Sequence, residues 1–268
     1  MLELLRLLRC ELCKLKRKRF VQLVIAAAFL FPVLLTFFFL NWDPIWEKCS
    51  TQAEVFDMMW QSVLGYGIQL FMPCILGIIA ALLFFMERDN DTFKSLKTIP
   101  VSSTKLVLAK VILLFLFSVV FCVASTITSV FCGGIVFEVQ GIGYKLWMSV
   151  KMGIYITAGT LPLVAVIVFC SKSYIFSILL CVFYSVLNEA GAFVMGALPK
   201  AVVYLMPVPL TTLWSADDMQ KHMVVSDPKD LESLRALIPA EAEVAVILFT
   251  VAFISVIFMV KLYQRRGE

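Results

Sequence analysis

Residues that could do chemistry are few in this sequence, and the first of them is a carboxylate in an apolar run. Glu189 follows Asn188 near the end of a stretch that carries no basic residue. A charged carboxylate inside a bilayer is costly unless it is protonated, paired or hydrated. Two interpretations remain open: either Asn188 and Glu189 end a helix at the headgroups, or Glu189 faces a wet cavity. In such a cavity Glu189 would meet a cationic substrate or the backbone of the residues that follow.

Two other groupings are too small to form a metal or catalytic centre. Cys10 and Cys13 form a C-x-x-C pair, but a structural zinc ion takes four ligands and no second pair exists. His222 is the single histidine, and it lies near Asp217 and Asp218 in a polar stretch. We therefore predict a solvated loop around His222, no metal site and no catalytic residue.

Motifs of the common hydrolases are absent from the sequence. It contains no G-x-x-x-x-G-K-[ST] phosphate loop, no H-E-x-x-H and no G-x-S-x-G. We predict that the chain is not an enzyme and binds no cofactor itself. An intramembrane enzyme remains the alternative of a different class. It would need paired ionisable groups at one depth in different spans, and only Glu189 approaches that pattern.

The amino-acid composition is typical of a membrane protein. Hydrophobic residues make up 61% of the 268 residues and charged residues only 16%, more apolar surface than a soluble protein of this length can bury. Most basic residues lie beside apolar runs, so the net charge of +4 does not indicate nucleic-acid binding. We predict an all-α polytopic membrane protein embedded in a lipid bilayer.

Apolar runs predict six transmembrane helices within a single domain, 1–268. Most are long enough to cross a hydrocarbon core of about 30 Å. The predicted spans are 20–40, 62–86, 106–132, 152–170, 174–187 and 239–262. Fifteen Lys and Arg residues fall in the proposed cytosolic segments and seven in the proposed external segments 41–61, 133–151 and 191–242. The positive-inside rule therefore places both termini in the cytosol.

Two segments outside the spans carry their own pattern. Residues 1–19 predict an amphipathic helix with leucines on one face and basic residues on the other, typical of a helix lying in the membrane interface. Residues 190–214 are apolar but contain three prolines. A straight span is excluded there, and a re-entrant or interfacial hairpin on the outer side is expected.

The polar segment 87–105 joins spans two and three. Phe93, Leu96 and Ile99 recur at helical spacing, and Pro100 ends the predicted short helix. The order of Glu87-Arg88, Thr92, Leu96, Pro100-Val101-Ser102, Leu106 and Lys110 resembles that of the permease subunits of ABC type-2 exporters. In that family a cytosolic coupling helix at this place docks on the ATPase subunit. The resemblance assigns ATPase coupling to Glu87, Arg88, Phe93, Lys94, Leu96, Lys97 and Pro100.

The same resemblance implies the partners and the substrate. A separate cytosolic ATPase dimer would carry ATP and Mg²⁺, and a second permease subunit, identical or different, would complete the pore. Length, the basic N-terminal helix and six spans are similar to permeases that protect bacteria from lantibiotics. An amphipathic antimicrobial peptide is the implied substrate and the bacterial cell membrane the implied location. Drugs, sodium and lipid-linked glycans remain alternative substrates of the same fold.

Overall fold

The protein is built almost entirely of helices. A computed structural model describes residues 2–49, 51–89, 102–170, 173–222 and 234–267, and no β-strand occurs among them. The helices are α1 (Leu2–Lys16), α2 (Arg19–Leu40), α3 (Asp43–Lys48), α4 (Gln52–Ser62), the π-helical stretch η1 (Val63–Leu70), α5 (Phe71–Asp89), α7 (Ser103–Val136), α8 (Ile142–Phe169), α9 (Tyr174–Phe193), η2 (Met195–Ala197), α10 (Lys200–Leu205), α11 (Pro207–His222), η3 (Arg235–Leu237) and α13 (Glu241–Gly267).

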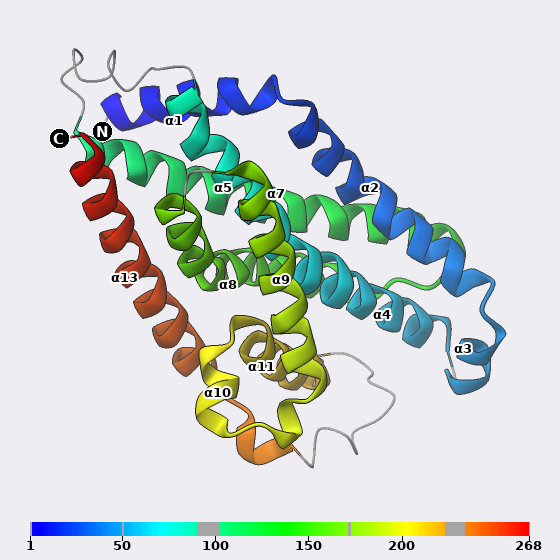
Figure 1. The fold of residues 1–268 in the computed structure, drawn as a ribbon. Helices are drawn as coiled ribbons and strands as arrows, with labels where there is room; N and C mark the ends of the chain where they lie inside the picture. The colour runs from blue at the N-terminus through cyan, green and yellow to red at the C-terminus, as the bar shows by residue number, and fades with distance from the viewer. Residues whose placement is uncertain (1, 50, 90–101, 171–172, 223–233, 268) are drawn as a thin grey trace.

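Six helical segments of the described chain are long and apolar enough to cross a membrane. They are Arg19–Leu40, Gln52–Phe85, Ser103–Val136, Ile142–Phe169, Tyr174–Phe193 and Glu241–Arg265. The prediction of an all-α polytopic membrane protein is confirmed. In Figure 1 the start of α1 and the end of α13 lie at one end of the bundle, and α3, α10 and α11 lie at the opposite end.

The bundle is arranged around α8. Within its most apolar window 78% of the residues are buried, against 28% for α2, α9 and α13. α8 packs against α7, α13 and α5, so it forms the centre while α2, α9 and α13 lie at the periphery. The outward faces of these peripheral helices carry large exposed apolar side chains, as helices in contact with lipid do.

Two predicted span boundaries were wrong by ten residues each. The second span begins at Gln52 rather than at residue 62, and the fourth begins at Ile142 rather than at residue 152. Segments predicted as the external loops 41–61 and 133–151 are therefore largely helical. Each of these segments contains an ionised residue, Asp57 in the first and Lys145 in the second, and the two are buried against each other inside the bundle.

A π-helical stretch interrupts the second span. Val63–Leu70 joins α4 to α5, and Pro73 follows within the first turn of α5. Proline has no N–H to donate to the carbonyl four residues earlier, which belongs to Gln69. The irregularity near Pro73 thus takes the form of a wide turn that precedes it. Such turns inside α-helices occur often at functional sites.

The chain after the fifth span is broken where the prolines predicted. α9 runs to Phe193, six residues beyond the predicted end at residue 187. Pro199 then precedes the short helix α10, and Pro207 opens α11. α11 packs against α8 and α9, so a second layer of helix covers this end of the bundle (Figure 1).

Candidate functional site

A polar cavity of about 310 Å³ lies between the π-helical stretch and α9, at the end of the bundle covered by α11. It is lined from α4, η1, α9 and α11. Its polar side chains are Gln61, Ser62, Tyr66, Gln69, Glu189 and Thr212. Of the two residues that the sequence marked as a substrate path, Glu189 lines this cavity, whereas Asn188 is buried and lines a different cavity of about 450 Å³.

Asn188 fixes the end of α9 to its neighbours. Its Nδ2 donates to the carbonyl of Tyr184 at 3.0 Å, and its Oδ1 accepts from the N–H of Val208 at 3.5 Å. The hydroxyl of Tyr184 in turn donates to the carbonyl of Gly159 in α8 at 2.8 Å. Asn188 satisfies a backbone donor at the start of α11, so it joins the outer helices α9 and α11.

Glu189 differs from its neighbour. Its Oε2 is enclosed by protein but makes no hydrogen bond, and Glu189 forms no ion pair within the described part of the chain. α9 continues for four residues beyond it. The interpretation that the helix ends at residues 188 and 189 therefore does not fit. Glu189 presents a carboxylate with unused hydrogen-bonding capacity to the cavity.

The opposite wall of the cavity contains a residue that sequence reasoning missed. Gln69 lies in the π-helical stretch and is 6% exposed. Its Oε1 accepts a hydrogen bond of 3.1 Å from Thr212 of α11, a residue 143 positions away. An amide in the middle of an apolar span was the available signal, because polar groups at membrane depth are expensive and mark interior sites.

A buried ion pair lies elsewhere at the same end of the molecule. Nζ of Lys145 on α8 is 2.8 Å from the Asp57 carboxylate on α4, and both side chains are at most 9% exposed. The Lys145 ammonium also donates to the carbonyl of Gln140 and lies 5.3 Å from the Phe56 ring. Both ionised residues lie in segments that the sequence predicted as external loops, so the pair was not predicted. Each charge is engaged by the other, which makes the pair a structural link rather than an acid–base centre.

Of the seven residues predicted to couple to the ATPase, the structure describes two, Glu87 and Arg88. Glu87 and Arg88 belong to the last turn of α5, which ends at Asp89. The positions predicted for the coupling helix itself lie outside the described residues: Phe93, Lys94, Leu96, Lys97 and Pro100. The chain resumes at Ser102, whose hydroxyl accepts from the N–H of Lys105 at 3.4 Å and caps α7.

Lys110 ties together the helices on either side of that segment. It is fully buried in α7, and its Nζ donates to the carbonyl of Leu83 in α5 at 2.5 Å. The same Nζ lies 4.8 Å from the Phe84 ring and 3.9 Å from a carboxylate oxygen of Glu11 in α1. One cation therefore connects α1, α5 and α7 close to the point where α5 leads into residues 90–101.

The two small groupings seen in the sequence form no centre in the structure. Tyr144 donates to Asp218 at 2.8 Å and stacks on His222 with ring centroids 4.6 Å apart. Lys221 donates a hydrogen bond to the Asp217 carboxylate, which raises the pKa of this lysine. Among the described residues no group of three or more His, Cys, Asp or Glu is close enough to hold a metal ion.

Comparison with known families identifies the fold. No curated protein matches the chain. The model of the family described as ABC-2 family transporter protein matches residues 7–188, well over half of the chain. The match begins within α1 and ends at residue 188 within α9, so it includes four of the six candidate spans completely and most of the fifth. The chain therefore belongs to the ABC-2 transporter family and is a multi-pass transmembrane permease of an ABC transporter.

Proposed function

We propose that this permease expels lantibiotic-like antimicrobial peptides from the bacterial cell membrane and so protects the cell that carries it. The observation that carries the proposal is the cavity of Glu189. A carboxylate without an internal partner, flanked by Gln61 and Tyr66, suits the cationic groups of an amphipathic peptide. The adjoining side chains of Met58 and Phe193 offer apolar surface to the rest of such a peptide.

The energy for export would come from a cytosolic ATPase dimer bound at residues 87–105. The ABC-2 family membership supports this partner, since ABC transporters are driven by ATPase subunits and the sequence has no phosphate loop of its own. α5 and α7 lead directly into and out of the segment, and Lys110 links both to α1. A second permease subunit, identical or different, would complete the translocation path.

In this proposal both termini and residues 87–105 lie in the cytosol, and residues 191–242 lie outside, with α10 and α11 forming a re-entrant or interfacial hairpin. The start of α1 and the end of α13 lie at one end of the bundle and α11 lies at the other, which supports this orientation (Figure 1). Single cysteines in a variant without the eight native cysteines provide a test. An impermeant thiol reagent should label Ser226→Cys in intact cells. Labelling of Thr92→Cys but not of Ser226→Cys would show that the chain has the opposite orientation in the membrane.

A protection assay tests the substrate. The chain is expressed with its ATPase and second permease in a sensitive host, and the lethal concentration of several lantibiotics is measured. We expect protection that falls in Glu189→Gln and persists in Glu138→Gln, which removes an exposed carboxylate outside the cavity. Protection against small hydrophobic drugs or sodium but against no lantibiotic would show that the substrate is not a peptide and is one of those alternatives.

Coupling is tested separately. Phe93→Asp and Leu96→Asp place charges on the apolar edge of the predicted coupling helix. The double variant should insert in the membrane at normal levels but lose the ATPase subunit on purification, or retain it without transport. A fully active exporter carrying both substitutions would show that this segment does not couple the ATPase.

A further inference from the structure

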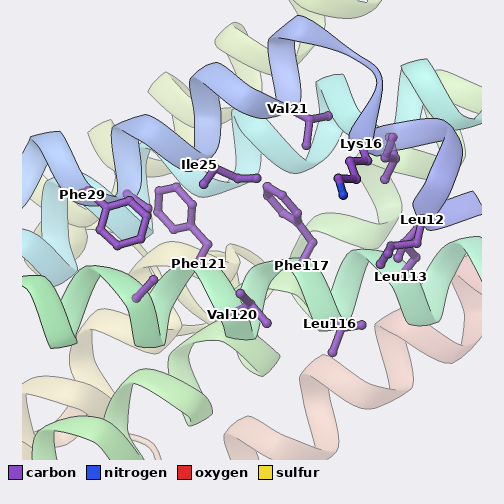
Figure 2. A pocket seen from close by; sticks show the side chains of 13 residues that line it. Leu12, Lys16, Val21, Ile25, Phe29, Leu113, Leu116, Phe117, Val120 and Phe121 are labelled. Atoms are coloured by element: carbon purple, nitrogen blue, oxygen red, sulfur yellow. The ribbon is translucent and has the colours of Figure 1, made fainter. Parts of the chain in front are cut away.

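An apolar pocket of about 420 Å³ lies far from the cavity of Glu189, in the corner where α1 turns into α2. Figure 2 shows its walls: side chains of α2 and α7 face one another across it, and α1 closes one end. Leu12, Val21, Ile25, Leu113, Phe117 and Phe121 form much of the lining. Its volume is in the range of pockets that bind small molecules, about 300–1,000 Å³.

The pocket opens on the outer surface of the bundle. Five of its lining side chains are about half exposed, namely Leu12 at 46%, Ile25 at 49%, Phe29 at 49%, Leu116 at 50% and Val120 at 59%. Around a membrane protein the medium at such a surface is lipid. Water does not fill an apolar pocket, because it finds no hydrogen-bond partners there. An acyl chain from the bilayer matches both the lining and the opening.

A single cation stands at the mouth of this pocket. Lys16, the last residue of α1, is the one charged residue among its lining side chains, and Figure 2 shows its amino nitrogen directed towards the space between α1 and α7. Lys14 is paired with Glu11, whereas Lys16 has no carboxylate partner among the described residues. Arg17, Lys18 and Arg19 continue the basic run at the same corner.

We propose that this pocket is a binding site for an anionic phospholipid of the bilayer. One acyl chain lies between α2 and α7, and the phosphate group is bound by Lys16 at the α1–α2 corner. Charge selects the headgroup, because a cluster of Lys and Arg beside a span attracts anionic lipid while a zwitterionic headgroup offers no net charge. The proposal depends on neither the substrate of the permease nor its ATPase.

Lipid retention tests the headgroup contact. The purified full chain is titrated with phosphatidylglycerol or with phosphatidylcholine of the same acyl chains, and bound lipid is counted by native mass spectrometry. Lys16→Gln should weaken phosphatidylglycerol binding about fivefold, the loss expected for one lysine at a headgroup. Lys261→Gln, an exposed lysine at the end of α13, should leave it unchanged. Equal binding in both variants, or no preference for phosphatidylglycerol in the unaltered chain, would overturn the proposal.

Cross-linking tests the acyl-chain contact. Phosphatidylglycerol with a diazirine in its acyl chain should label the α7 residues 113–124 of the unaltered chain. Val120→Trp fills the mouth of the pocket and should abolish this label, while Val246→Trp, on the exposed face of α13, should retain it. Labelling that survives in Val120→Trp, or α7 peptides that cross-link to a second copy of the chain instead, would show that a lipid does not occupy the pocket.

Discussion

Two carboxylates at the same end of the molecule have opposite surroundings. Asp57 of α4 is 2.8 Å from Lys145, and that lysine is further enclosed by aromatic rings. Glu189 of α9 has no ion-pair partner in the described chain and opens onto a polar cavity. Both interrupt apolar surroundings and both cost free energy to bury. The charge of Asp57 holds α4 and α8 together, whereas the carboxylate of Glu189 has no internal partner among the described residues and can bind a ligand.

The helix that carries Asp57 also contributes to the cavity. Met58, Gln61 and Ser62 of α4 line the same cavity as Glu189, whereas Asp57 contacts Lys145 of α8. α4 therefore lies between the ion pair of Asp57 and Lys145 and the cavity that contains the Glu189 carboxylate, unpaired within the described chain. Burial of a charged side chain does not by itself indicate a binding site. An internal partner indicates a structural role, as at Asp57, and its absence indicates a role in binding, as at Glu189.

The largest effect is expected from breaking the closed pair. Lys145→Met leaves the Asp57 carboxylate buried without its cation, which should lower the free energy of unfolding by about 3–5 kcal/mol. Thermal unfolding of the detergent-solubilised chain measures the loss. The double variant Asp57→Leu/Lys145→Met removes both charges and should recover most of the stability. If the Lys145→Met protein is as stable as the unaltered chain, the pair does not stabilise the fold.

A smaller effect is expected at Asn188. Asn188→Ala removes the acceptor for the N–H of Val208 and should destabilise the protein by about 1–2 kcal/mol. Because this hydrogen bond joins α9 to α11, faster hydrogen exchange should concentrate at the start of α11. Uniform exchange across the bundle would contradict an anchoring role for this residue.

The smallest effect on stability is expected at Glu189 itself. Glu189→Gln keeps the shape of the side chain and removes no internal bond, so the free energy of unfolding should not fall by more than about 0.5 kcal/mol. The same unfolding assay measures it beside Lys145→Met. A loss comparable to that of Lys145→Met would mean that Glu189 has an internal partner and belongs to the same class as Asp57.

The sequence was sufficient for the membrane fold because hydropathy and helix length report on it directly. Six spans and the amphipathic helix before Arg19 were predicted and are present. Boundaries failed where polar residues are satisfied inside the bundle. Asp57 and Lys145 are distant in sequence, and no hydropathy window reveals that they pair across two helices.

The candidate site was predictable only in part. Glu189 was marked by its charge in an apolar run, yet its companions come from three other segments of the chain. Gln69 enters the cavity through the π-helical stretch, and Thr212 reaches it through α11. The return of α11 onto the π-helical stretch does not follow from local pattern, because it depends on contacts between segments that are far apart in the sequence.

Equilibrium binding of a cationic lantibiotic to the purified exporter in zwitterionic nanodiscs tests the central claim most directly, namely that the Glu189 carboxylate receives the positive charge of the substrate. A contact between a charged group and its partner accounts for about 1.5–3 kcal/mol, so Glu189→Gln should weaken binding about tenfold or more. Glu138→Gln should bind as the unaltered exporter does. A lysine-acetylated form of the peptide should bind the unaltered and Glu189→Gln exporters equally. Equal affinity of the cationic peptide for all three proteins would contradict the account.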